Sequence, residues 1–305
     1  MNFNQILETA AGWAWGPPML VLLVGTHLYL TIRLRFIQRY LVHAIRISLQ
    51  RGSEGAGDVS HFGALTTALA ATVGTGNIVG VATAITLGGP GAVLWMWLTG
   101  VFGIATKYAE ALLAVKYRVV TPEGTMAGGP MYVLERGMNS KPLATFFAAM
   151  TAIAAFGIGN MVQANAVTSL VCETFPAVPA AWFQWGLGLA MAGLTALVIL
   201  GGIKSIARWC TLLVPFMAGF YVLGCAAILV MNRHALPGTL ATIFTSAFTG
   251  QAAVGGFLGA GLKEAIRYGV ARGLFSNESG MGSAPIVAAA AQTSTPVRQA
   301  LVSAT

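Results

Sequence analysis

The chain has 305 residues, of which 56% are hydrophobic and only 9% are charged, and its formal net charge at pH 7 is +8. Soluble domains carry about 25% charged residues, so this chain cannot cover itself with polar surface in water. The composition excludes a soluble protein and predicts an all-α polytopic membrane protein. Its three cysteines show neither disulfide-framework nor metal-site spacing, and we interpret them as small core residues.

Seven apolar segments approach the roughly 20 residues that a membrane-spanning helix needs. The first is followed by arginines and not by a small-residue cleavage site, so we interpret it as a retained helix. Between the first two segments, residues 33–61 have the spacing of an amphipathic helix on the inner membrane surface. The predicted spans are 17–32, 62–88, 90–116, 142–171, 181–200, 207–231 and 241–266.

The basic residues predict how the chain is oriented. When the seven segments alternate across a bilayer, 16 of the 17 Lys and Arg residues fall on one side and Arg233 falls opposite. Because basic residues collect in cytoplasmic loops, that side is predicted to be the cytoplasm. We therefore expect a multi-pass protein of the cell inner membrane with its N-terminus outside. The positive charge reflects topology, and no nucleic-acid partner is indicated.

Two glycine-interrupted segments form an internal repeat. "VGTGNIVG" (73–80) lies in the second predicted span and "TGQAAVGG" (249–256) in the seventh, and each carries a Thr-Gly-amide triplet. Counting from the second span to the seventh gives five helices per repeat, an odd number, so the two copies must cross the membrane in opposite directions. Interrupted helices in inverted halves are typical of the midplane site of a transporter. Close helix packing also favours glycine, but the paired amides favour a site.

Three stretches carry a resemblance to a known family. They are 71–110, with "GGPGA" and "WMW", then "GTMAGGPMYVLERG" (124–137), and "FSNESGMGSAPIVAAAA" (275–291). In these stretches the chain resembles the sodium:alanine symporter family, the alanine or glycine:cation symporters. That resemblance implies a five-plus-five inverted-repeat fold preceded by one extra helix, and sodium-coupled import of small neutral amino acids such as alanine and glycine.

The expected organisation follows from the repeat and the resemblance together. Residues 1–61 would hold the extra transmembrane helix and the amphipathic helix, and 62–236 the first five-helix repeat. Residues 237–305 would begin the second repeat, which is incomplete because four more helices would be needed. We therefore expect a truncated chain, and the oligomeric state is not indicated.

The first interruption offers two kinds of backbone group. Free N–H groups at the start of the outer half-helix suit a carboxylate, and free C=O groups at the end of the inner half suit a cation. We expect Thr75, Gly76 and Asn77 to receive the substrate carboxylate. A co-transported sodium ion would take oxygens from Ala71, Thr72, Val73 and the Asn77 side chain, because hard cations prefer oxygen ligands. The resemblance also implies this role for Thr72, Val73 and Asn77.

Further polar residues in predicted spans complete the candidate site. Thr245 and Ser246 are expected to contribute to the sodium site, and Thr249 and Gln251 to the substrate site. In the fourth span, Gln163 is the first choice for a substrate contact, and Asn160 and Asn165 lie on neighbouring turns. Hydrogen bonding between helices is the alternative role for these amides.

Three alternative functions differ in the residues that they require. Glu110 and Glu264 are predicted to lie near cytoplasmic helix ends beside lysines, so neither is placed as a midplane proton relay, and sodium coupling is favoured over a proton-coupled permease. An enzyme is disfavoured because the four His residues are scattered. A non-transporting membrane fragment stays an alternative.

The predicted orientation can be tested by labelling single cysteines from outside intact cells. Substitutions at Ser53 and Ser140 should escape a membrane-impermeant thiol reagent, whereas one at Thr239 should react. Strong outside labelling of Ser53 would contradict the orientation.

Overall fold

The computed structural model describes residues 2–50, 55–175, 180–249 and 261–305, and it is mostly helical, as expected. Within these described residues, six helical stretches are long and apolar enough to cross a membrane by length and composition, and they correspond to the first six predicted spans. The seventh, 241–266, includes residues 250–260, which lie outside the described residues. The six stretches are Gln5–Arg33, His61–Gly88, Ala92–Lys116, Lys141–Thr174, Trp182–Ile199 and Gly202–Met231.

The predicted interruption of the second span is present. Helix α4 (His61–Thr72) ends before Val73, and α5 (Thr75–Gly88) begins after Gly74. Gly74 has extended backbone angles, φ −161° and ψ −153°, so the helical hydrogen-bond pattern stops there. We call Val73–Gly74 the first break.

A second broken helix packs against the first. Helix α13 (Leu262–Asn277) is joined to the short α14 (Ala284–Ala289) by residues 278–283, which we call the second break. Three residues in it have positive φ, a conformation that no α-helix contains: Glu278 at 53°, Gly280 at 83° and Gly282 at 82°. Helix α14 continues beside α4 and α6.

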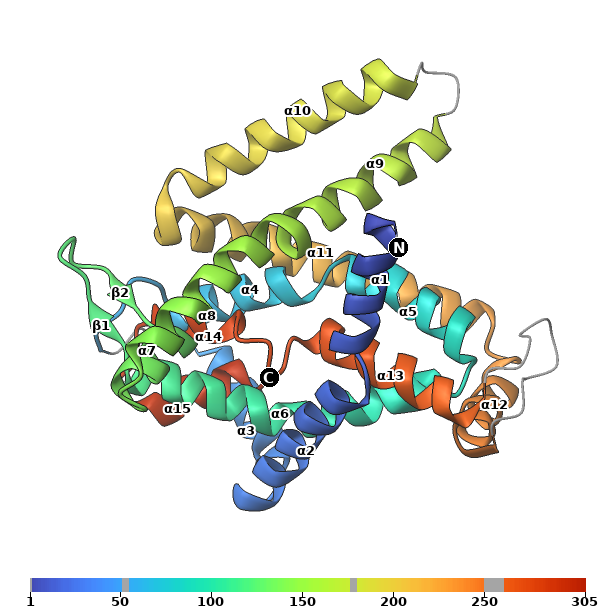
Figure 1. Ribbon diagram of the computed structural model, residues 1–305, viewed down its shortest axis with the longest axis horizontal. Coiled ribbons are helices and arrows are strands. Elements are labelled where there is room, and N and C mark those ends of the chain that lie inside the picture. Colours follow the sequence, from blue (N-terminus) through green and yellow to red (C-terminus); the bar gives the residue numbers. More distant parts are fainter. Residues whose placement is uncertain (1, 51–54, 176–179, 250–260) are drawn as a thin grey trace.

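The two broken helices run antiparallel, as Figure 1 shows. A Cβ atom on Gly88, at the end of α5, would lie 3.1 Å from Tyr268 Cβ in the first half of α13. At the other end of the contact, a Cβ on Gly76 would lie 3.2 Å from the ring of Phe275. The end of α13 therefore meets the beginning of α5, and the second break lies beside the first.

Small residues allow this approach. α13 also runs along α6 (Ala92–Lys116), and a Cβ on Gly269 would lie 2.5 Å from the Ala92 carbonyl oxygen. At Gly273 an added Cβ would lie 2.9 Å from Thr99 Cβ. Glycines at such contacts let helix backbones come close together in a membrane protein.

Among the described residues, the segment that lies beside the first break is the second break. Thr249, the first residue of the expected segment, is the last residue of α12 (Leu236–Thr249), and the rest of that segment lies outside the described residues. Helix α12 packs on the beginning of α6, where Trp95 Nε1 donates to the Ala247 carbonyl oxygen at 3.1 Å. In the part of the chain that the structure describes, the interruption beside the first break is "NESGMGS" (277–283).

This arrangement also bears on where three basic residues lie. Lys263, Arg267 and Arg272 were expected beyond a cytoplasmic helix end. Lys263 and Arg267 lie in the first half of α13, whose beginning is beside the end of α5. Arg272 lies in its second half, where a Cβ on Gly80 of α5 would be 3.8 Å from Arg272 Cδ. The other basic residues still favour the same orientation.

The arginine-rich end of the molecule is closed by short elements. These are η1 (Ile37–Tyr40), α3 (Leu41–Ser48), the strand pair β1 (Val119–Val120) and β2 (Met126–Ala127), α7 (Pro130–Arg136) and α15 (Pro296–Ser303). α3 is amphipathic as predicted, with Val42 and Ile45 exposed and Ala44 buried.

The Arg118 side chain joins two segments at this end of the molecule by hydrogen bonds. The Arg118 guanidinium donates to the carbonyl oxygens of Ala56, Ala289 and Ala291 at 2.7, 3.0 and 2.8 Å. Burial lowers the pKa of Arg118, and the negative charge of Asp58 acts in the opposite direction. The beginning of α4 and the end of α14 are thereby held together.

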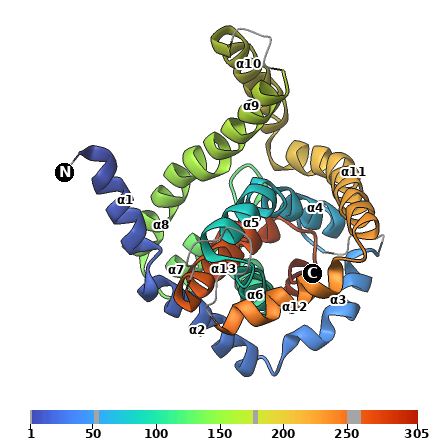
Figure 2. The same ribbon diagram turned by 90° about the vertical axis from the view of Figure 1, so that its right-hand side faces the viewer.

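The remaining helices surround this centre. α2 (Pro17–Arg33) packs on α6, and α11 (Gly202–Met231) packs on α4, while α1 (Phe3–Ala14) precedes α2. α8 (Lys141–Ala154), η2 (Ala155–Met161) and α9 (Val162–Thr174) form one long helix. Figure 2 shows α9 and α10 (Ala180–Ile199) as a pair that extends away from the other helices.

A disulfide cross-link tests where the second break lies. A Cβ on Gly103 would lie 3.2 Å from Ser279 Cβ, close to the separation of bridged cysteines. In a protein without its native cysteines, we expect Gly103→Cys to cross-link to Ser279→Cys on mild oxidation. The matched pair of Gly103→Cys with Thr249→Cys should stay reduced. Cross-linking of the second pair alone, seen by a gel shift after cleavage between the two sites, would contradict the arrangement.

Candidate functional site

A cavity of about 480 Å³ lies where the two breaks meet. Residues of α4, both breaks, α5, α8, η2, α9 and α13 line it, so it draws on segments far apart in the sequence. Its described lining residues are Ala70, Ala71, Thr72, Val73, Gly74, Gly76, Thr151, Ala154, Ala155, Gly159, Gln163, Phe275, Glu278, Met281 and Ser283.

The structure brings Gln163 to the beginning of α5. Its side-chain Oε1 accepts a hydrogen bond from the Thr75 hydroxyl at 2.8 Å and another from the Thr75 backbone N–H at 3.3 Å. An amide oxygen therefore occupies the position that the sequence analysis reserved for a carboxylate. Because a ligand carboxylate can accept the same two bonds, this contact marks an acceptor position at the helix N-terminus.

Asn77 bridges the two halves of the first broken helix. Its side-chain Nδ2 donates to the Thr72 carbonyl oxygen at 2.9 Å, and its Oδ1 accepts from the Ser276 hydroxyl at the end of α13. Its backbone N–H donates to the Gly74 carbonyl oxygen at 3.0 Å. Asn77 thus satisfies a carbonyl group left free by the end of α4, while joining α13 to the first break.

Two glycines lie where an added side chain would crowd residues that line the cavity. A Cβ on Gly76 would lie 3.2 Å from two ring carbons of Phe275, and one on Gly74 would lie 3.4 Å from the Gln163 amide. Both residues line the cavity. Side chains at these positions would crowd Phe275 and Gln163 and cover the backbone. Because glycine has no side chain, the backbone stays accessible from the cavity there.

One feature of the site was not predicted. Residues Ala155–Met161 form a π-helical segment, η2, which the sequence analysis placed inside a regular span. π-helical turns are rare and often occur at functional sites. Ala155 and Gly159 in this segment line the cavity, and the glycines of "FGIGN" were the available signal.

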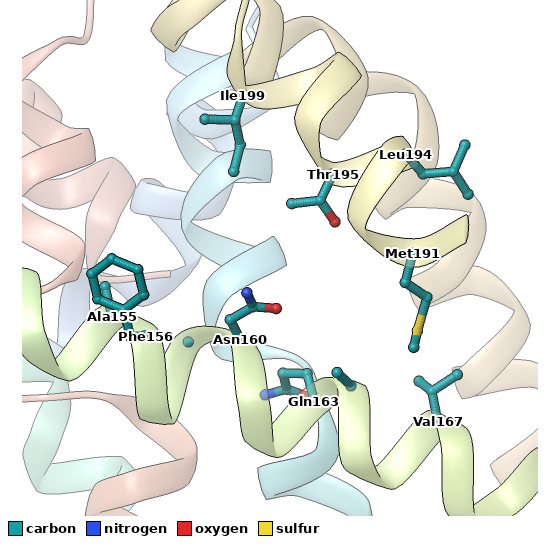
Figure 3. Close-up of a pocket in the computed structure, with 11 residues that line it drawn as sticks. Ala155, Phe156, Asn160, Gln163, Val167, Met191, Leu194, Thr195 and Ile199 are labelled. Atoms are coloured by element: carbon teal, nitrogen blue, oxygen red, sulfur yellow. The ribbon is translucent and has the colours of Figure 1, made fainter. Parts of the chain in front are cut away.

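A second, more open cavity of about 700 Å³ lies on the other side of this helix, against α10 (Figure 3). Asn160 projects into it from η2, and Gln163 borders both cavities. Asn165 is exposed and lines neither of the two. Of the three amides in the fourth span, only Gln163 reaches the first break.

The candidate residues on α12 are not brought to this cavity. The Thr245 hydroxyl donates to the Ala241 carbonyl oxygen at 2.9 Å, and the Thr249 hydroxyl donates to the Thr245 carbonyl oxygen at 2.8 Å, so both bond within their own helix. Ser246 packs against Gly91 at the beginning of α6. Gln251 lies outside the described residues.

A carboxylate that the sequence analysis did not single out lines the cavity. Glu278 opens the second break, and its Oε2 accepts a hydrogen bond from the Ser283 hydroxyl at 2.9 Å. Glu110 lies nearby on α6, where its Oε2 accepts from the Gly280 backbone N–H at 3.2 Å. The signal for Glu278 was a charged residue in a glycine-containing segment directly after a helix.

Comparison with known proteins places the whole chain in one group. Residues 1–305 match the model of the sodium:alanine symporter family. The chain is 52% identical over 312 residues to the sodium/alanine symporter AgcS of Methanococcus maripaludis, covering 100% of this chain and 67% of that protein. It is 41% identical to the putative sodium/proton-dependent alanine carrier protein YrbD of Bacillus subtilis, covering 95% of this chain and 58% of that protein.

A further relative, the probable sodium/glutamine symporter GlnT of Bacillus subtilis, is 39% identical, with 99% of this chain and 62% of that protein covered. The chain therefore spans about two thirds of the length of the curated relatives it matches. These relatives carry the names of transporters and not of enzymes.

Proposed function

The chain belongs to the sodium:alanine symporter family, and we propose that the protein it forms is a sodium-coupled symporter that imports small neutral amino acids, alanine or glycine, across the cell inner membrane. The observation that carries this proposal is the cavity of about 480 Å³ between two antiparallel broken helices. Such breaks are tolerated in a bilayer where they line a cavity, and transporter sites are built from them. Alternating access around this cavity, with the N-terminus outside, completes the proposal.

The substrate carboxylate is proposed to bind at the beginning of α5. Thr75 and Gly76 belong to its first turn, where backbone N–H groups lack helical acceptors and the helix dipole favours negative charge. Gln163 now accepts from Thr75, so it would turn to donate its amide N–H groups when a carboxylate takes its place. The cavity volume suits a small amino acid together with water.

Sodium is proposed to bind at the end of α4. The carbonyl groups of Ala71, Thr72 and Val73 lie at the helix C-terminus, where the dipole favours a cation. Asn77 Oδ1 would complete the oxygen set by exchanging its bond to Ser276 for the ion. Thr245 and Ser246 stay outside this set, since α12 packs at the beginning of α6.

Proton coupling is the second candidate, because a carboxylate lines the cavity. Glu278 places a carboxylate in the wall of the cavity, where a titratable group can carry a proton with the substrate. One relative is named as sodium/proton-dependent. The carbonyl oxygens at the end of α4 nevertheless favour sodium, because they cannot bind a proton at neutral pH.

Uptake of labelled alanine into proteoliposomes distinguishes the two couplings. We expect uptake by the full-length protein to fall to background when external sodium is replaced by choline, and to persist when a protonophore collapses the proton gradient. The opposite pattern would exclude sodium coupling.

The same assay tests the role of Asn77. Asn77→Ala should raise the sodium concentration for half-maximal uptake by about tenfold, because one oxygen ligand and the bridge to Thr72 are both lost. Asn165→Ala, the same change at an exposed position, should leave that concentration unchanged. Equal values for the two variants would remove Asn77 from the sodium site.

A further inference from the structure

Glu278 is the one ionisable side chain that lines the described part of the cavity. It takes no part in the contacts proposed above for sodium and for the substrate carboxylate. Of the described lining residues, Glu278 alone carries a formal charge; the others are apolar, glycine, hydroxyl, thioether or amide groups. A single carboxylate in such a wall is costly to bury unless a positive group pairs with it.

The chain holds this carboxylate close to the proposed substrate. Phe275 and Ser276, at the end of α13, contact Gly76 and Asn77 at the beginning of α5. Glu278 follows two residues after Ser276, and the hydroxyl of Ser283 fixes its Oε2 at 2.9 Å. The carboxylate therefore borders the same cavity as the α5 N-terminus.

The electrostatic surroundings of Glu278 include one cation and a second carboxylate. Two other ionisable groups, Lys107 and Glu110 on α6, are close enough to Glu278 to act on it electrostatically. Lys107 acts on Glu110 as well, and Glu110 also accepts from the Gly280 backbone N–H. The Lys107 ammonium is therefore shared between two carboxylates, Glu110 and Glu278.

We propose that Glu278 is a specificity-determining residue whose carboxylate pairs with the α-ammonium group of the transported amino acid. This inference rests on the proposed function. With the substrate carboxylate at the beginning of α5, the ammonium lies one carbon atom away, inside the same cavity. A carboxylate that lines the cavity would make the site require an amino group on the substrate, since sites built for a polar group strongly reject analogues that lack it.

A sodium ion is the other monovalent cation that a carboxylate could attract here. We assign the ammonium because it needs a counter-charge inside the cavity, whereas sodium has neutral carbonyl ligands available at the end of α4. Pairing with the ammonium group and pairing with sodium predict different results for Glu278→Gln. This change keeps the size of the side chain and removes its charge.

The test compares L-alanine with propionate, which has the same carbon skeleton and carboxylate but no amino group. Their affinities are measured by isothermal titration on detergent-purified full-length protein at saturating sodium. We expect the unmodified protein to prefer alanine by at least about tenfold. In Glu278→Gln the ratio of the two affinities should fall about ten- to a hundredfold, with alanine binding weaker and propionate binding stronger. Glu264→Gln, the same change in the first turn of α13, should keep the original ratio.

Several results would overturn the inference. An unchanged ratio in Glu278→Gln would do so, as would an unchanged ratio with a raised sodium requirement, which would assign Glu278 to the ion. Equal binding of alanine and propionate by the unmodified protein would also overturn it, with no variant needed. Failure of the unmodified protein to bind alanine at any sodium concentration would instead reject the proposed function.

Discussion

A backbone hydrogen-bonding group without a partner costs several kcal/mol in hydrocarbon, and the structure depends on this constraint. The first break frees carbonyl groups at the end of α4 and N–H groups at the beginning of α5. Asn77 and Gln163 satisfy some of them from within the protein. A break can persist only where such partners, or a ligand, are available, so its position fixes where the site must lie.

The second broken helix supplies the other side of that site. It can come close because the contacts of α13 with α5 and α6 are made by glycines, at Gly88, Gly269 and Gly273. Packing of small residues along α13 thereby places Ser276, near the end of this helix, and Glu278, directly after it, beside the first break. The Ser276 hydroxyl thereby becomes a neighbour of the Asn77 amide, although the two residues are 199 positions apart in the sequence.

The sequence was informative where a pattern had one physical explanation. Low charge and long apolar segments predicted the membrane helices, and "VGTGNIVG" predicted the first break, because glycine and an amide disfavour a helix interior. Gln163 was singled out for its cost in an apolar helix, and it does reach Thr75.

The sequence did not predict the second break. "NESGMGS" is polar enough to look like a loop, yet among the described residues it is the segment that faces the first break. Residues 250–256 of the expected "TGQAAVGG" interruption lie outside the described residues. A broken helix interrupted by charge has no continuous apolar run, so a search for spans divides it. The π-helical turn has no periodic signal in a sequence.

The central claim is that exposed backbone at the first break holds the substrate, and alanine binding to Gly76→Val tests it most directly. A Cβ there would lie 3.2 Å from Phe275 at the edge of the cavity, whereas Gly100→Val in α6 adds the same side chain where a Cβ meets no atom within 4 Å. Affinity is measured on the monodisperse fraction of each full-length protein, so loss of folded protein is not counted as loss of binding. We predict that Gly76→Val abolishes alanine binding and that Gly100→Val keeps it. Unchanged affinity in folded Gly76→Val would contradict the account and place the substrate elsewhere.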